Sequence, residues 1–349
     1  MQIRSRAALA AALVGATFLG LALSACAPGS GSTGDADSAN TIHIVGFAVP
    51  EAANKLIATE FNKTDEGEGV TFQTSYGPSG DQSRAVAAGL KADYVHFSVP
   101  TDVTRLVDEG LVDEAWDQGD NKGVVSTSVV VFGVREGNPK NIKTWADLVK
   151  PGVEIVTPNP ASSGAARWNA LAAYGQVISD GGTEEEATDY VNKLFKNVVS
   201  LPGSGRDATT AFLGGTGDVL MAYENEAILA AQNDEAFEYI LPDTTLKIEN
   251  AGAILKDASE PSQAWLDFVL SDEGQKQFAL TGFRPIHDDV DYGGTVEGAK
   301  DPADPFPTVK TLLTVDKDFG GWDEVSTKFF DEENGLIFEA ILGAGLSLE

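Results

Sequence analysis

The sequence predicts an α/β protein of two lobes with a ligand cleft between them. Predicted strands and amphipathic helices alternate along the chain, which favours α/β units around a mostly parallel sheet. The alternation restarts after Pro151, and a length of 349 residues suits about two domains. The hydrophobic fraction of 42% supplies enough apolar residues to build their cores.

The N-terminus is predicted to be a processing segment rather than part of the fold. Arg4 and Arg6 precede an apolar run that ends in small residues, so residues 1–25 are a predicted secretory signal. The segment Leu23-Ser24-Ala25-Cys26 resembles the bacterial lipoprotein box, which implies cleavage before Cys26 and acylation of its thiol. Residues 26–40 then form a flexible Gly/Ser/Asp tether, and the folded body begins outside the cytoplasmic membrane.

The first part of the body shows both periodicities clearly. Val70, Phe72 and Thr74 alternate with polar neighbours, as in a half-buried strand, and residues 51–62 place apolar side chains at helical spacing. A β-branched run at residues 126–134 predicts a further strand. Strands are expected at residues 42–47, 70–75, 94–97 and 126–134, and helices at 51–62, 79–90 and 101–109.

The second part repeats the pattern with an Ala-rich helix and two shorter ones. Strands are expected at residues 153–156, 198–201 and 219–223, and helices at 163–178, 184–196, 206–213 and 224–231. The strands at 126–134 and 219–223 are expected to cross between the lobes. Lobe I then comprises residues 41–127 plus about 225–300 and lobe II residues 128–224, while residues 301–349 are left unassigned.

Charge and composition exclude several classes of function. The 53 acidic and 24 basic residues disfavour binding to nucleic acid, which requires clustered Lys and Arg. Removing Arg4 and Arg6 with the signal leaves 22 basic residues against 53 acidic ones, a net charge of -31. One cysteine and three histidines leave no Cys-rich or His-rich metal site, and no cofactor motif is found.

Three strand-to-helix turns are candidates for binding an anion. Each is small and rich in Gly and Ser, and each precedes a predicted helix, where backbone N–H groups are free and the helix dipole is positive. The alternative for any one turn is that Ser simply caps its helix. The turns are Gly77-Pro78-Ser79-Gly80, Ser162-Ser163-Gly164-Ala165 and Gly203-Ser204-Gly205-Arg206.

No catalytic constellation stands out. Ser163 lacks a G-x-S-x-G elbow, no histidine is linked to it by a motif, and no P-loop occurs. The sequence therefore predicts no enzyme, with an anchored hydrolase that uses Ser163 as nucleophile kept as the alternative from another class. Asp81 and Asp207 lie just inside two of the candidate helices, where they either complement the dipole or accept a proton from the ligand.

Two longer motifs resemble the signatures of the prokaryotic sulfate-binding proteins. They begin at Thr157-Pro158-Asn159-Pro160, followed by ASSGAARWN, and at Gly217-Asp218-Val219-Leu220, followed by MAYENEA. Shorter matches lie in the same order along the chain, so the resemblance runs from about residue 41 to the C-terminus. They are Arg135-Glu136-Gly137-Asn138-Pro139, Glu273-Gly274-Gln275, Phe283-Arg284-Pro285 and Phe319-Gly320-Gly321-Trp322.

The resemblance implies a two-lobed, periplasmic-binding-protein-like fold of type II and a receptor for an ABC importer. In that family neutral donors hold a buried oxyanion, with no salt bridge and no metal. The implied partners are sulfate or a related oxyanion and the ABC permease, and the receptor is a monomer anchored to the membrane by lipid. Carried over by motif, the ligand-binding residues are Ala48, Ser79, Ser163, Gly164, Ala165, Gly205 and Tyr223.

Departures from the family pattern concern the choice of anion. Tyr223 stands where the better-known members have Trp, Ala165 replaces a usual Gly, and Asp81 stands where Lys is common. Ala48 replaces a usual Asp, but the donor there is the backbone. Sulfate is the expected ligand, with thiosulfate, phosphate or molybdate as alternatives within the same class.

Overall fold

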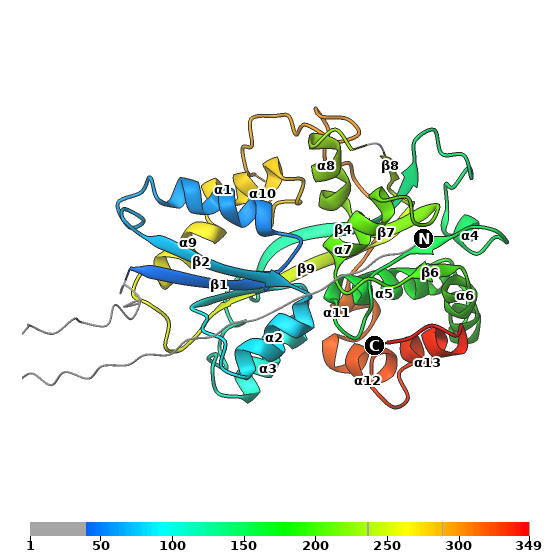
Figure 1. The fold of residues 1–349 in the computed structure, drawn as a ribbon, viewed down its shortest axis with the longest axis horizontal. Coiled ribbons are helices and arrows are strands. Elements are labelled where there is room, and N and C mark those ends of the chain that lie inside the picture. Colours follow the sequence, from blue (N-terminus) through cyan, green and yellow to red (C-terminus); the bar gives the residue numbers. More distant parts are fainter. Residues whose placement is uncertain (1–39, 236, 288, 349) are drawn as a thin grey trace, which may run out of the picture. The chain divides into compact units, whose positions relative to one another are not determined.

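Figure 1 shows a computed structural model of the chain, which describes residues 40–348 apart from residues 236 and 288. The described residues form one compact unit. The expected signal and the lipidation site at Cys26 lie outside them. Within the described ranges, no helix has the length and apolar character needed to cross a bilayer.

The first half of the sheet consists of three parallel strands, each followed by a helix. β1 pairs in parallel with β2 and with β3, and β1 is buried along its whole length. Helix α1 lies on one face of these strands and α2 and α3 lie on the other (Figure 1). The elements are β1 (Thr41–Phe47), α1 (Glu51–Phe61), β2 (Thr71–Gly77), α2 (Ser79–Ala87), β3 (Tyr94–Phe97) and α3 (Pro100–Asp108).

The second half of the sheet repeats this arrangement with shorter strands. β5 pairs in parallel with β6 and with β7. The Ala-rich α5 is almost wholly buried, which explains why its sequence lacks a polar face. The elements are β5 (Ile155–Val156), α5 (Gly164–Ser179), α6 (Glu184–Lys196), β6 (Val198–Ser200), α7 (Gly205–Leu213), β7 (Val219–Tyr223) and α8 (Glu224–Gln232).

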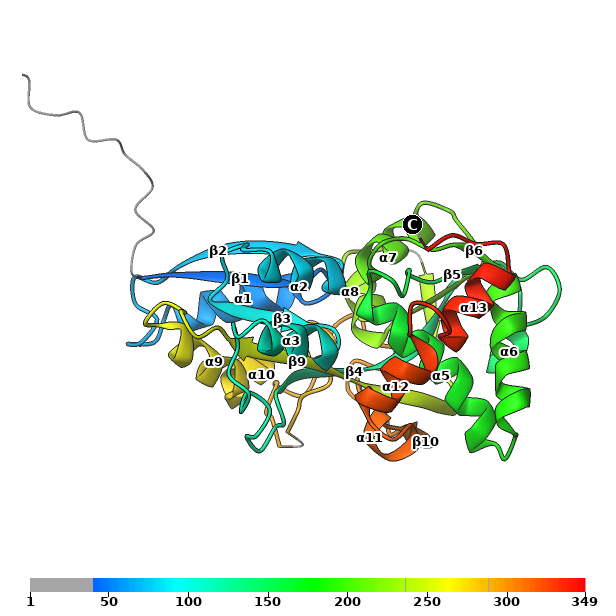
Figure 2. The same cartoon turned by 90° about the horizontal axis from the view of Figure 1, so that it is seen from below.

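Two long antiparallel strands, β4 (Val124–Arg135) and β9 (Thr244–Ile254), join the two halves. The strand order is β2-β1-β3-β9-β4-β7-β5-β6, so β9 pairs with β3 and β4 pairs with β7. The sheet is therefore mixed rather than mostly parallel. Figure 2 shows β9 and β4 running between the two halves. The expected strand at residues 126–134 is β4 and the one at 219–223 is β7. Their crossing between lobes and the expected lobe boundaries remain predictions.

The remaining elements were not predicted from the sequence. β8 pairs with β4, and β10 pairs with β9. The C-terminal helices pack against α5 and α6, with the Trp168 and Trp322 rings edge to face at 4.8 Å. These elements are α4 (Trp145–Leu148), β8 (Phe237–Ile240), α9 (Ser262–Leu270), α10 (Asp272–Leu280), β10 (Thr311–Leu313), α11 (Val315–Asp318), α12 (Trp322–Phe329) and α13 (Leu336–Gly343).

The secondary structure expected between residues 42 and 231 is confirmed. Every expected strand and helix is present, and no end differs by more than three residues. Trp168 and Trp265 are fully buried in the core. Trp265 packs edge to face against Phe61 and Tyr94 beneath the first half of the sheet.

Candidate functional site

The carboxyl ends of the strands in both halves meet at one place. The Gly80 N–H, at the start of α2, donates to the Ser162 carbonyl oxygen at 2.9 Å, just before α5. A Cβ built on Gly205 would lie 3.1 Å from Val49 Cγ2 and 3.3 Å from the Ala165 Cβ. The structure thus brings the three candidate turns together, as ligand sites at strand ends require.

Most helices that begin here have no side-chain cap. The first turns of α1, α2, α5 and α8 lack a capping hydrogen bond. Ser163 is the N-cap residue of α5 but does not cap it, whereas Ser204 caps α7 by accepting from the Asp207 N–H at 3.1 Å. The capping alternative therefore holds for Ser204 and fails for Ser163, whose hydroxyl bonds to none of the described residues.

The start of α5 offers a compact set of donors. The N–H groups of Gly164 and Ala165 have no acceptor among the described residues, because the first turn of a helix has no intrahelical partner. Ser163 and Ala165 are both buried. A Cβ built on Gly164 would lie 2.5 Å from Ser98 Oγ, so only glycine fits at this position.

Ser79 occupies the first helical position of α2, and its hydroxyl is already engaged. It donates to Asp102 Oδ2 at 2.6 Å and accepts from the Ser98 N–H at 2.9 Å. The Ser79 backbone N–H has no acceptor among the described residues. Ser79 can therefore offer a ligand its N–H rather than its hydroxyl.

The backbone N–H groups of Gly205 and Ala48 differ in whether they already have an acceptor. Gly205 begins α7, and its N–H has no acceptor in the described part of the chain. The Ala48 N–H instead donates to the Gly77 carbonyl oxygen at 3.0 Å, one residue beyond the end of the ladder between β1 and β2. A ligand would have to displace Gly77 to use the donor at Ala48.

Tyr223 joins the site from the end of β7 through a buried hydroxyl network. Its Oη lies 2.7 Å from Ser98 Oγ and accepts from Asn250 Nδ2 at 3.2 Å. Burial holds the pKa of the Tyr223 phenol above its usual value, although the hydrogen bonds with Ser98 and Asn250 oppose this shift. The phenol therefore keeps its proton at neutral pH and remains a hydrogen-bond donor.

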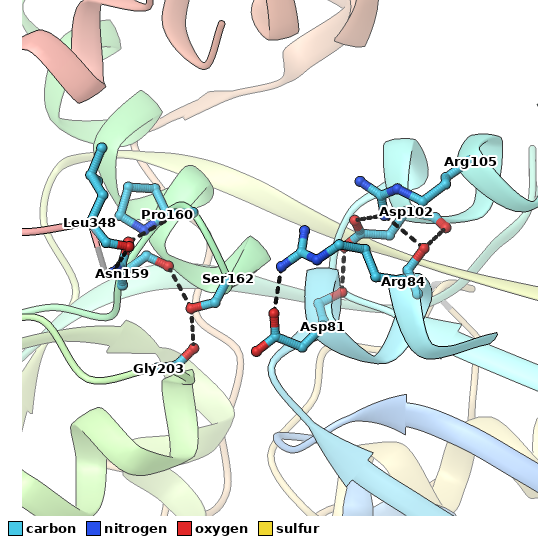
Figure 3. Close-up of polar contacts among 12 residues, drawn as sticks. Asp81, Arg84, Asp102, Arg105, Asn159, Pro160, Ser162, Gly203 and Leu348 are labelled. Carbon is cyan, nitrogen blue, oxygen red and sulfur yellow. Dashed lines mark hydrogen bonds and ion pairs between the residues drawn. The ribbon is translucent and has the colours of Figure 1, made fainter. Parts of the chain in front are cut away.

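Two arginines around the site are paired with carboxylates. Arg206 binds the Glu226 carboxylate through two nitrogens, at 3.0 and 2.7 Å, and also donates to the Val49 carbonyl oxygen at 3.2 Å. Figure 3 shows the ion pair of Asp81 with Arg84 on α2. The charges of Arg84 and Arg206 are thus balanced within the protein, and the groups that the uncapped helix starts offer a ligand are neutral donors.

The site contains a carboxylate, Asp102, that was not expected beside Asp81 and Asp207. Asp81 pairs with Arg84, and Asp207 Oδ2 accepts from Ser204 Oγ at 2.7 Å. A further carboxylate at the site is Asp102, which is buried and accepts from the Ser79 hydroxyl. Sequence reasoning missed it because α3 carries no Gly/Ser-rich turn.

Sequence reasoning also missed Ser98 and Asn250. Ser98 follows β3 directly and precedes α3, so it has the same strand-to-helix position as the three candidate turns. The sequence therefore did contain a signal for Ser98, namely its place between a predicted strand and a predicted helix. Asn250 lies within β9, a strand that was not predicted, and nothing local in the sequence marks it. Figure 3 shows how the Asn159–Ser162 turn faces α2.

Comparisons with known proteins agree with this geometry. The family model for bacterial extracellular solute-binding proteins matches residues 42–284. A sulfate-binding protein from Synechococcus elongatus is 39% identical over 335 residues, 92% of each chain. A thiosulfate-binding protein from Pseudomonas aeruginosa is 38% identical over 291 residues, which are 80% of this chain and 84% of the relative.

A solved structure extends the likeness to three dimensions. The sulfate-binding protein SubI from Mycobacterium tuberculosis is 42% identical and superposes with a TM-score of 0.78, covering 84% of this chain and 100% of SubI. The expected two-lobed, periplasmic-binding-protein-like fold is thereby confirmed. The chain belongs to the prokaryotic sulfate-binding protein family, within the bacterial extracellular solute-binding proteins.

Proposed function

We propose that this protein is the receptor of an ABC importer and captures sulfate or thiosulfate outside the cytoplasmic membrane. The observation that carries the proposal is the convergence of uncapped helix N-termini from both halves of the sheet. Relatives named for sulfate and thiosulfate binding, at 37–39% identity, support this ligand class. The protein acts by binding and release, without catalysis.

The proposed site uses neutral donors. Helix N-termini favour anions because free N–H groups and the helix dipole point at the ligand. The Ser163 hydroxyl adds a donor that no described residue occupies. The ligand-binding set is Ala48, Ser79, Ser163, Gly164, Ala165, Gly205 and Tyr223, with Ala48 joining once the Gly77 oxygen is displaced.

Local donors rather than net charge supply the affinity. A mature charge of -31 repels a dianion, but charges farther away than about 8 Å are largely screened at physiological salt. A hydrogen bond to a charged group contributes roughly 1.5 to 3 kcal/mol. A handful of such bonds offsets desolvation and leaves micromolar affinity, about -8 kcal/mol.

The proposal includes the location of the receptor. The signal at residues 1–25 and the lipobox ending at Cys26 support export followed by lipid anchoring. The tether at residues 26–40 then lets a monomeric binding body deliver its ligand to the permease. Lobe I (residues 41–127 plus about 225–300) and lobe II (residues 128–224) are proposed to close on the anion.

Isothermal titration calorimetry against sulfate, thiosulfate, phosphate and molybdate tests the function. We expect sulfate or thiosulfate to bind most tightly, with affinity nearly constant between pH 6 and pH 8 because sulfate stays a dianion. Phosphate carries a proton near pH 7 and finds only donors, which costs about 1 to 3 kcal/mol. Tighter binding of phosphate than of sulfate would overturn the proposal.

Ser163→Ala separates the receptor from a serine hydrolase. We expect at least a tenfold loss of sulfate affinity, since one charge-assisted hydrogen bond disappears. Ser179→Ala, at the exposed end of the same helix, is the matched control and should bind like the wild type. Hydrolysis of a chromogenic ester by the wild type that is lost in Ser163→Ala would favour the hydrolase.

A further inference from the structure

Ser98 lies at the centre of the candidate site and has one unused donor. It is fully buried at the end of β3, between Ser79, Gly164 and Tyr223. Its N–H donates to Ser79 Oγ and its carbonyl oxygen accepts from Trp168 Nε1 at 2.9 Å. Its hydroxyl has one partner among the described residues, Tyr223 Oη. The direction of that one hydrogen bond decides whether the Ser98 hydroxyl can donate its hydrogen to a ligand.

Asn250 fixes which groups donate and which accept in this hydrogen-bond network. One end of its amide lies 3.1 Å from the Ser98 carbonyl oxygen, which can only accept, so this end is Nδ2. The second hydrogen of Nδ2 is donated to Tyr223 Oη at 3.2 Å. The other end, Oδ1, accepts from Ser126 Oγ at 3.1 Å, so the Ser126 hydroxyl is the donor there.

The network continues beyond Ser126 in the same direction. Because Ser126 donates to Asn250, its oxygen is free to accept from His96 Nε2, which lies 3.2 Å away. Each member then donates one hydrogen towards Tyr223. Across the 2.7 Å between Tyr223 Oη and Ser98 Oγ either hydroxyl can be the donor. We infer that the phenol donates, because Asn250 already occupies the in-plane lone pair of the phenol oxygen. The Ser98 hydrogen is left without an acceptor in the described part of the chain.

We propose that Ser98 is a further ligand-binding residue, whose hydroxyl donates to the bound oxyanion. Asn250 and Tyr223 are positioning residues that turn its hydrogen towards the ligand. The inference rests on the proposed function, because it names one more donor for the same anion. It also gives Tyr223 a different role: Tyr223 acts through Ser98 instead of donating to the anion itself.

The arrangement has a consequence for selectivity. A serine hydroxyl has one donor, and here one of its lone pairs takes the Tyr223 hydrogen. It therefore presents a donor to the ligand, as a fully ionised anion requires. An anion that still carries a proton meets another donor at Ser98, so Ser98 strengthens the preference for dianions that only accept.

Sulfate calorimetry on three variants tests the inference. Ser98→Ala should bind sulfate at least tenfold more weakly, because it removes one hydrogen bond to a charged group. Ser98→Thr keeps the hydroxyl and should recover most of that loss. Tyr223→Phe should cost less than Ser98→Ala, because Ser98 still donates, although its hydrogen is no longer directed.

Two controls keep the result interpretable. Ser128→Ala removes another fully buried hydroxyl, one without a hydrogen-bond partner among the described residues, and should leave sulfate affinity unchanged. Urea denaturation of each variant separates lost binding from lost stability. Failure of the wild type to bind sulfate or thiosulfate would reject the proposed function itself. Wild-type binding with full affinity in Ser98→Ala, or a larger loss in Tyr223→Phe than in Ser98→Ala, would reject only the role of Ser98.

Discussion

The Gly80 N–H and the Ser162 carbonyl oxygen, 2.9 Å apart, join the start of α2 to the turn before α5. A backbone hydrogen bond between two small residues brings the peptide groups of both halves close together. Its neighbours include backbone N–H groups and hydroxyls, and the nearby Arg84 and Arg206 are paired with Asp81 and Glu226. The site thus depends on close backbone approach, which larger side chains would prevent.

Gly164→Ala should weaken sulfate binding by roughly one to two decades. Its Cβ would lie 2.5 Å from Ser98 Oγ, and overpacking of this kind costs about 1 to 3 kcal/mol. The matched control is Gly203→Ala, whose Cβ would find its nearest atom at 3.7 Å. Calorimetry checks both variants, and equal affinities in the two would contradict the close approach of Gly164 to Ser98.

Arg284→Met should destabilise the protein by about 3 kcal/mol or more, because it leaves a buried carboxylate unpaired. Glu224 is fully buried, and its oxygens accept from Arg284 Nε at 2.7 Å and from Nη2 at 3.1 Å. Urea denaturation at pH 7 measures the loss. Lys310→Met is the control: its partner Asp243 is exposed, so no measurable change is expected.

The Arg284→Met defect should depend on pH in a defined direction. Burial raises the pKa of Glu224, and Arg284 opposes that rise, so the variant should raise it further. A carboxyl with a raised pKa keeps its stability contribution below the unfolded pKa and loses it as the pH rises. The deficit relative to wild type should therefore be smaller at pH 5 than at pH 8. An equal deficit at both values would argue against an unpaired Glu224.

His96 should make the wild type lose stability in acid. Burial lowers the pKa of the imidazole from 6.5 to about 3, so the folded state holds it neutral. Between these values the unfolded chain binds more protons, and stability rises with pH by up to about 1.4 kcal/mol per unit, then levels off above 6.5. Urea denaturation between pH 4.5 and 7.5 should show a shallower slope in His96→Gln.

Cys26→Ser should release the protein from the membrane or leave it unprocessed. The acylated thiol is the proposed anchor, and no other cysteine exists in the chain. Fractionation and intact-mass measurement check the outcome, with Ser30→Ala in the tether as a control that stays anchored. A Cys26→Ser protein of normal mature mass in the membrane fraction would exclude lipid anchoring at this residue.

Local sequence was sufficient to predict an element wherever the segment itself has a clear periodicity or turn motif. The alternation at Val70–Thr74 and the Gly/Ser turn before α5 predicted both the elements and the donors of Ser163 and Gly164. The apolar alternation of Leu246 and Ile248 in β9 is too short to predict the strand, because Asn250 takes the next apolar position. That strand is stabilised by pairing with β3 and β4, which no local window reveals.

The sequence by itself determined the α/β class, the order of the early elements and the three turns that favour an anion. These properties depend on spacing, turn chemistry and the free N–H groups of a helix start, all of which lie within a few residues of each other. Only the tertiary structure decided which donors are free. The Ser79 hydroxyl and the Ala48 N–H are occupied by Asp102 and Gly77, while Ser98 is aligned by Asn250 from a distant strand. Hydrogen-bond partners far apart in sequence meet only when the sheet forms, and for that reason the sequence alone could not assign them.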